Sequence, residues 1–340
     1  MPSPGSNRRM LVFAVVCLVS LGGAAAYAVS DLDRYRDRIA EAPPIDRAAE
    51  ASFADEPRIV FRNTAIGHDY GFVATVALAD PGGPRAVTDL SCDRIDVVAT
   101  GGSCLRSEPG VVTRYRWLDL DADLDVVDES PLAGMPSRTR LSPDGSKVAS
   151  TVFVAGHSYM QVGFSTATVV REVGGSGWGN LEHFQLIIDG KPVSPVDRNV
   201  WGVTFDPDGS GFYATVATGG SPYLVRGDLA KRTLTTIRAG AECPALSPDG
   251  SRVAYKKDIG KGEVHWAVAV LDLASGTERV LDQEERSVDD QLQWLDDDTL
   301  LYALPRDDDP GVTDVWALPV DGAAAPEVLI EQAWSPAVVN

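Results

Sequence analysis

The feature that most restricts the fold of this chain is a short segment that occurs three times. The copies are LSPDGSKVAS from Leu141, FDPDGSGFYA from Phe205 and LSPDGSRVAY from Leu246. In each copy an apolar residue ends one strand, proline and glycine provide the φ angles of a tight turn, and an alternating apolar strand follows. Each copy therefore predicts one β-hairpin.

Three weaker copies extend the series: VATGGSCL from Val98, WLDDDTLLYA from Trp294 and WSPAVV from Trp334. In the first of these, Gly102 takes the place that Gly145 has in LSPDGSKVAS. Successive copies lie about 40 to 50 residues apart, with one longer interval, and two more strand-like runs follow most hairpins. Six units of four strands at this period predict a six-bladed β-propeller.

The last copy supplies only one strand before the sequence ends. Three strand-like runs without a repeat signature, RIVFRN, YGFVATVALAD and PRAVTDL, lie between residues 58 and 90. These runs can complete the sixth blade, which leaves no open sheet edge. We therefore expect an all-β propeller of four-stranded blades over residues 58–340, closed by its N-terminal strands and preceded by one hydrophobic helix.

The first 30 residues determine the expected compartment. Arg8 and Arg9 precede an uncharged apolar stretch, residues 10–29, which as a helix is long enough to cross a bilayer. The arginines predict that residues 1–9 are a cytoplasmic basic tail and that the chain after Ser30 is exported. Residues 10–29 are either a retained transmembrane anchor or a signal peptide, because AYA at 26–28 has the form of a cleavage site.

Residues 30–57 are charged and read as a linker, in which a turn or two of helix is ended by Pro43 and Pro44. The formal net charge of −19 excludes nucleic acid as a partner, because its phosphates would repel this surface. The expected localisation is a single-pass membrane protein with an extracytoplasmic C-terminal domain, or a secreted protein after signal cleavage.

No segment has the pattern of a known catalytic or metal site. VGGSGWGN and ATGGSPYL do not have the G-x-S-x-G spacing of a nucleophile elbow. DLDADLD, residues 119–125, alternates carboxylates as a calcium loop does, but Leu124 stands where an EF-hand has glycine. The histidines do not pair at ligand spacing. We predict no catalytic residue, no metal and no cofactor, although side chains of several blades can still meet at a central channel.

Propeller geometry also locates the expected binding surface. Loops between the second and third strands share one face with the loops between blades, and the SPDG turns lie on the opposite face. Loops on the first face begin near Gly156, Thr218, Lys256 and Arg286. The predicted binding residues are His157, Ser158, Tyr159, Gly219, Gly220, Lys256, Asp289 and Asp290. As exposed loop residues, His157 and Asp289 should tolerate replacement by alanine with little change in melting temperature.

Two features of the sequence leave alternatives open. Cys92, Cys104 and Cys243 follow the apolar segment and allow at most one intramolecular disulfide. Cys92 and Cys104 are the default pair, yet a straight strand between them would hold them roughly 20 Å apart. The long interval between repeats, around VREVGGSGWGNLEHF, is either a ligand-binding insertion or a longer hairpin.

The SPDG hairpins resemble the PD40 repeats, which are WD40-like, of TolB-like propeller proteins. The segments GHSY, NVWGVTFDPDG, YATVATGG and ECPALSPDGSRVAYKK are similar to actinobacterial proteins labelled TolB-like. The resemblance implies an extracytoplasmic, non-catalytic scaffold that binds an envelope protein or a cell-wall ligand. TolB has an extra N-terminal α/β domain that this sequence lacks, so the resemblance does not extend to the Tol-Pal partnership. The alternative function is a metal-dependent propeller hydrolase or lyase.

The expected topology can be tested by protease protection. In cells carrying the chain with a tag at each end, external protease should cleave the propeller and the linker and leave Arg8 and Arg9 intact, because only the region after Ser30 is exported. Immunoblots of the two tags give the result. Protection of the C-terminal tag until the membrane is permeabilised would contradict the topology.

Overall fold

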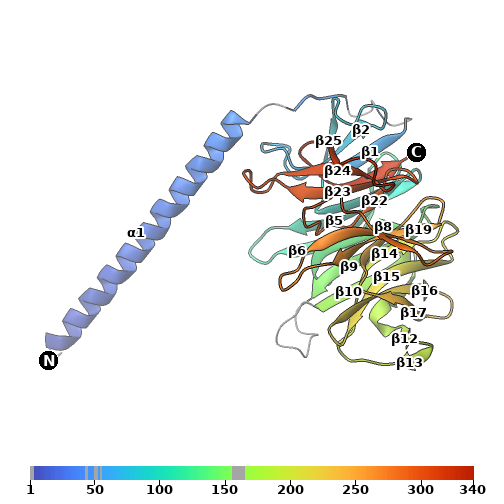
Figure 1. Ribbon diagram of the computed structural model, residues 1–340. Helices are drawn as coiled ribbons and strands as arrows, with labels where there is room; N and C mark the ends of the chain where they lie inside the picture. Colours follow the sequence, from blue (N-terminus) through green and yellow to red (C-terminus); the bar gives the residue numbers. More distant parts are fainter. Residues whose placement is uncertain (1–3, 43–44, 50–52, 54–55, 155–164) are drawn as a thin grey trace. The chain divides into compact units, whose positions relative to one another are not determined.

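The computed structural model describes residues 4–42, 45–49, 53, 56–154 and 165–340. It divides into two units, an N-terminal helical one and a β-rich one, and each is considered by itself. The helix α1 covers Pro4–Glu41 (Figure 1). From Met10 onward it is long and apolar enough to span a membrane. A signal sequence near an N-terminus has the same length and apolar character.

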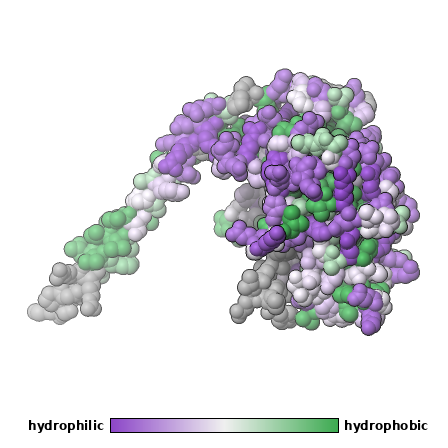
Figure 2. All heavy atoms as spheres, viewed as in Figure 1, coloured by the Kyte–Doolittle hydropathy of each residue, from purple (hydrophilic) through white to green (hydrophobic). Residues whose placement is uncertain are grey.

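Helix α1 continues about three turns beyond the apolar stretch, further than the expected turn or two. Its surface accordingly changes from hydrophobic to hydrophilic along its length (Figure 2). Arg36 lies 3.6 Å from Asp33, one turn earlier, and such pairs support an exposed helix. The helix ends at Glu41, just before Pro43 and Pro44 in the sequence, which cannot continue it.

The region from Arg58 onward forms six sheets, each built on four antiparallel strands, which confirms the six-bladed propeller (Figure 1). From inner to outer strand, blade 1 is β26 (Ala333–Val339), β1 (Arg58–Asn63), β2 (Phe72–Ala77) and β3 (Ala86–Ser91). Blade 2 is β4 (Arg94–Val98), β5 (Gly101–Glu108), β6 (Arg114–Leu120) and β7 (Val126–Pro131). Blade 3 is β8 (Met135–Leu141), β9 (Lys147–Val154), β10 (Ser165–Glu172) and β11 (Gly177–Asn180).

The other three blades follow in chain order. Blade 4 contains β14 (Asn199–Phe205), β15 (Gly211–Thr218), β16 (Ser221–Asp228) and β17 (Thr233–Ala239). Blade 5 is β18 (Glu242–Leu246), β19 (Arg252–Asp258), β20 (Trp266–Asp272) and β21 (Glu278–Val280). Blade 6 is β22 (Gln293–Trp294), β23 (Thr299–Pro305), β24 (Thr313–Pro319) and β25 (Glu327–Ile330).

The ring closes in blade 1, as expected, because the C-terminal strand β26 pairs antiparallel with β1. The repeat pattern predicts that Trp334 corresponds to the residues that end the other inner strands, and this prediction is wrong by four residues. Ser335 (φ 55°) and the Pro-Ala after it repeat the conformation and sequence of Cys243 (φ 51°) and its Pro-Ala. Val338 is therefore the counterpart of Leu246, and the proline of WSPAVV lies within a strand rather than in a turn.

The SPDG turns are fastened by their own side chains. In the copy at Leu246, Gly250 (φ 72°) donates its N–H to the carbonyl of Ser247 (2.8 Å). The Asp249 carboxylate accepts from Ser247 Oγ (2.6 Å) and from the N–H of Ser251 (2.9 Å). These bonds lower the pKa of Asp249 to about 2, so the carboxylate stays ionised and holds the turn.

The hairpin of blade 2 differs from the SPDG copies and explains the cysteine pair. Its turn is Ala99–Thr100, and Gly102 lies in β5 opposite Val97, so Gly102 does not correspond to Gly145 as the sequence suggested. The turn folds β5 back along β4. Cys92 and Cys104 consequently lie with Cα atoms 5.6 Å apart and form a disulfide, which a straight strand between them would have prevented.

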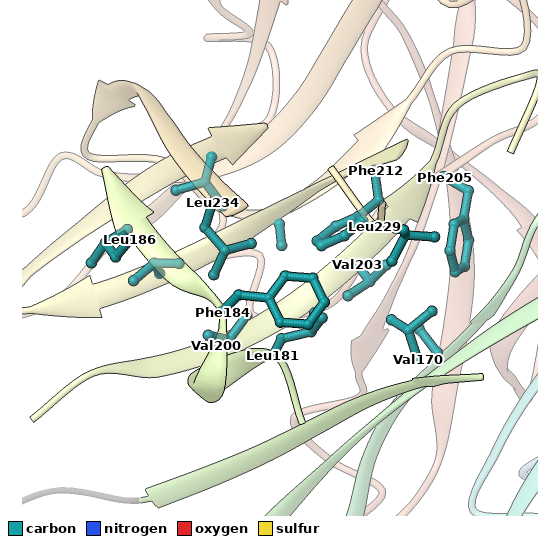
Figure 3. Close-up of a cluster of buried hydrophobic side chains, with 14 residues drawn as sticks. Val170, Leu181, Phe184, Leu186, Val200, Val203, Phe205, Phe212, Leu229 and Leu234 are labelled. Atoms are coloured by element: carbon teal, nitrogen blue, oxygen red, sulfur yellow. The ribbon is translucent and has the colours of Figure 1, made fainter. Parts of the chain in front are cut away.

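Beyond β11, the fourth strand of blade 3, the surplus residues of the long repeat interval form the short helix η2 (Leu181–His183), β12 (Gln185–Ile188) and β13 (Lys191–Val193). Strand β12 pairs in parallel with β17 and so extends blade 4 to six strands. Figure 3 shows Leu181, Phe184 and Leu186 of this insertion packed into a buried cluster with side chains of β10, β14 and β15. The insertion therefore belongs to the core between blades 3 and 4.

Replacing the turn glycine Gly250 by valine should destabilise the propeller by about 1–3 kcal/mol, because a β-branched residue is strained at positive φ. A Cβ at this position would also lie 3.1 Å from Pro207 Cγ. Gly82→Val is the matched control, since a Cβ there meets no atom within 4 Å. Denaturant unfolding of the full chain measures both variants, and equal losses would contradict the role of the turn.

Candidate functional site

The inner strands of the blades line a central channel, and local irregularities direct their side chains into it. The register shifts within β8, β14, β18 and β26. In three of these strands a residue at the shift has positive φ: Gly202 (66°), Cys243 (51°) and Ser335 (55°). Such bulges re-aim side chains near functional sites. At these shifts the inner strands depart from the regular alternation of side chains between two faces. Polar and aromatic side chains consequently point into the channel.

Three cavities follow one another along the channel. The mouth cavity, of about 330 Å³, is lined by Arg94, Ser137, Arg138, Phe153, Thr166, Trp201, Glu242, Cys243, Lys256, Trp266 and Asp289. A constriction of about 20 Å³ shares Arg94 and Arg138 with it. A third cavity, of about 240 Å³, shares Arg140 with the constriction and reaches prolines of the SPDG and DPDG turns. The mouth cavity is therefore on the side of the loops between second and third strands.

Two ion pairs, each with a largely buried cation, lie at the mouth cavity. Lys256, only 4% exposed, bonds to Asp289 and lies 4.7 Å from the centre of the Trp266 ring. Burial opposes its charge, but the neighbouring Cys243 and Asp289 outweigh burial and raise the pKa of Lys256. Arg94 pairs with Asp290 at 3.2 Å. These contacts keep positive charge inside a cavity with aromatic walls.

The constriction is closed on the turn side by Arg140. Its guanidinium lies 3.2 Å from Asp96 Oδ1 and bonds to Gln293, and the other oxygen of Asp96 accepts from Leu141 N (2.7 Å). Burial raises the pKa of Asp96 and Arg140 opposes that rise. Burial and, secondly, Arg138 lower the pKa of Arg94 to about 10, which still leaves Arg94 charged at neutral pH.

A larger cavity, of about 520 Å³, opens beside the insertion. Glu182, one of its two carboxyl residues with Asp197, accepts hydrogen bonds from Thr166 Oγ1 (3.0 Å), Thr168 N (3.2 Å) and Val200 N (3.2 Å). Burial raises the pKa of Glu182 to about 7. Because these bonds join β10 to β14, the carboxyl serves the junction of blades 3 and 4. We therefore regard the channel mouth as the better candidate.

The structure brings together some of the residues that the sequence suggested. Lys256 and Asp289 both line the mouth cavity, while Asp290 is buried at the constriction. Gly219 and Gly220 form the tip between β15 and β16 and are not among the residues that line the channel cavities. His157, Ser158 and Tyr159 lie outside the described residues. Arg286 stacks on Trp316 at 3.7 Å and is bound to Glu284.

Sequence reasoning missed the inner-strand residues, although the repeats contained a signal for them. Arg138, Cys243 and Gln291 each stand three positions before the residue that ends the inner strand. All three line the mouth cavity or the constriction. Aligning the repeats upstream of the turns, rather than examining the loops alone, would have identified them.

In the part of the chain that the structure describes, carboxylates of the acidic run DLDADLD bond to other groups of the protein. Asp119 makes two bonds to Arg171 (2.6 and 2.9 Å), and Asp121 Oδ1 accepts from the N–H groups of Asp123 and Asp125. Within residues 4–154 and 165–340, apart from short gaps before residue 56, no group of three or more His, Cys, Asp or Glu side chains is placed to hold a metal.

Comparison with known proteins supports the fold and goes no further. No protein-family model matches the sequence, and no curated protein matches it. Among solved structures, TolB from Acinetobacter baumannii is 19% identical, with a TM-score of 0.57 over 84% of this chain and 67% of that chain. A putative TolB from Agrobacterium tumefaciens is 11% identical, with a TM-score of 0.51 over 82% of this chain and 90% of that chain.

A puromycin-hydrolyzing peptidase from Mycobacterium tuberculosis is 16% identical, with a TM-score of 0.46, covering 81% of this chain and 43% of that chain. The likeness to the two TolB structures shows a shared fold. The chain has the TolB-like fold, a six-bladed β-propeller, and an N-terminal hydrophobic helix.

The structure revises the expectation for Asp289→Ala. The carboxylate is 72% exposed, but its removal leaves the buried Lys256 ammonium without its ion-pair partner. We expect Asp289→Ala to lower the free energy of unfolding by about 1 kcal/mol, a loss kept small by the solvent access of Asp289. Removing an exposed side chain without an ion pair would cost nothing. Adding Lys256→Met should recover most of it. Urea unfolding compares these variants with Glu285→Ala, an exposed control, and a loss no larger than that of the control would contradict the pairing.

Proposed function

We propose that this propeller is an extracytoplasmic, non-catalytic binding module that receives a protein or cell-envelope ligand at its channel mouth. Residues 10–29 either anchor it in the membrane or are removed as a signal peptide. The observation that carries the proposal is the mouth cavity, which is lined by strand residues of four of the six blades and by Asp289 of the connection between blades 5 and 6. A TolB-like fold supports a binding or envelope role.

The composition of the mouth cavity favours recognition of another molecule. Phe153, Trp201 and Trp266 line its walls, and Lys256 and Arg94 contribute cations. Aromatic and arginine side chains dominate the binding energy of protein interfaces when they lie in concave, well-packed places. Strands of several blades hold these groups, so a ligand would meet a surface that is already organised.

The alternative, a metal-dependent hydrolase or lyase, receives less support from the described side chains. They provide no group of three metal-binding residues, and the channel carboxylates Asp96, Asp289 and Asp290 are each paired with a cation. Asp289, for instance, pairs with Lys256 and Asp96 with Arg140. We therefore place binding ahead of catalysis.

Site-specific crosslinking in the native membrane tests the proposal. A photoreactive amino acid at Trp266 should capture a protein or wall fragment, identified by mass spectrometry, and the same group at Val328 on the outer strand β25 should not. A second experiment places the photoreactive amino acid at Phe153. In that protein, adding Trp266→Ala should reduce capture at least about tenfold and leave the melting temperature nearly unchanged. Capture from Val328 and none from the mouth would contradict the proposal.

A further inference from the structure

Three polar atoms of the channel are buried without a hydrogen-bond partner: Arg138 Nε, Arg140 Nε and Gln291 Nε2. The part of the chain that the structure describes has only two other such side-chain atoms, Arg62 Nε and Arg106 Nε. Gln291 is 9% exposed, so its amide is largely withdrawn from solvent. Buried donors are nearly always paired, and each one left unpaired costs stability. Of these three residues, only Arg138 also lines the mouth cavity, so its unpaired Nε indicates an acceptor that binds there.

Arg138 differs from the other cations of the channel. Arg94, Arg140 and Lys256 each have a carboxylate oxygen within 3.2 Å. Arg138 donates one hydrogen bond, to its neighbour's carbonyl at Ser137 (2.8 Å). Its nearest carboxylate oxygen, on Asp290, is 4.0 Å away, beyond hydrogen-bond distance. A guanidinium has five N–H donors, so Arg138 keeps most of its bonding capacity for another group.

We propose that the mouth cavity binds a small free monocarboxylate, whose oxygens accept hydrogen bonds from Arg138. A carboxylate matches the planar fork of a guanidinium. A single negative charge is favoured because Asp289 and Glu242 line the same cavity and would repel a dianion. The site concerns a small ligand and does not require the protein partner considered above.

The dimensions place this ligand in the mouth cavity and not in the constriction. The constriction, of about 20 Å³, has room for little more than one water molecule. The mouth cavity, of about 330 Å³, also contains Arg138 and can accommodate the tail of an acid. Phe153, Trp201 and Trp266 line its walls, so an apolar or aromatic tail should strengthen binding.

Thermal unfolding of the full chain in detergent tests the inference on the unaltered sequence. Acetate should raise the melting temperature, phenylacetate should raise it further, by about 2 °C or more near saturation, and acetamide and phenylacetamide should not, at equal ionic strength. Equal shifts with acids and amides would overturn the proposal. Stabilisation by an acidic peptide, with none by the free acids, would also overturn it, by assigning the carboxylate to a partner chain.

Variants locate the effect. Arg138→Met should abolish the shift given by phenylacetate, and Arg138→Lys, which retains charge without the fork, should keep a smaller one. Arg106→Met is the matched control, because Arg106 also has an unpaired Nε but binds Glu108 away from the channel. It should keep the full shift. An unchanged shift in both Arg138 variants, or in Arg138→Lys alone if Arg138→Met does not fold, would overturn the assignment.

Discussion

The pairing of β26 with β1 is the constraint on which the rest of the structure depends. It joins residues near 58 to residues near 339 and converts a row of sheets into a ring. Without it, blade 1 would lack its inner strand, and an inner strand of the channel wall would be missing. Ser335, which lines the constriction, and Trp334, which lies 4.2 Å from the Arg94 guanidinium, are both on β26. The same strand pairing therefore closes the ring and completes the wall of the channel.

The channel shows how this scaffold combines stability with recognition. Ion pairs such as Arg94 with Asp290 neutralise charges that burial would otherwise make costly. Positive-φ residues, Cys243 among them, bend the inner strands so that these charges can meet. Arg138, at the register shift of β8, remains incompletely bonded. Groups that are withdrawn from water but not fully paired are where a scaffold can still gain binding energy.

Sequence reasoning was sufficient for the fold and insufficient for the site. The SPDG turns determined the blades because their signal is local: Gly250 and Asp249 act within one hairpin. The site depends on residues from different blades, such as Arg138 and Asp289, whose proximity follows from closing the ring and not from spacing along the chain. The alignment at Trp334 failed because a proline looks alike in a turn and in a bulged strand.

The parallel pairing of β12 with β17 has a consequence for how the ring opens. Residues that follow blade 3 in the chain make backbone hydrogen bonds to the outer strand of blade 4, and Phe184 lies in the core between the two. Separating blades 3 and 4 would therefore break up this hydrophobic cluster, while the segment that follows β11 stays bound to blade 4 through β12. In local unfolding they should behave as one cooperative unit, while the other four blades are joined by side-chain packing and short connections. The ring is mechanically asymmetric although its repeats look equivalent.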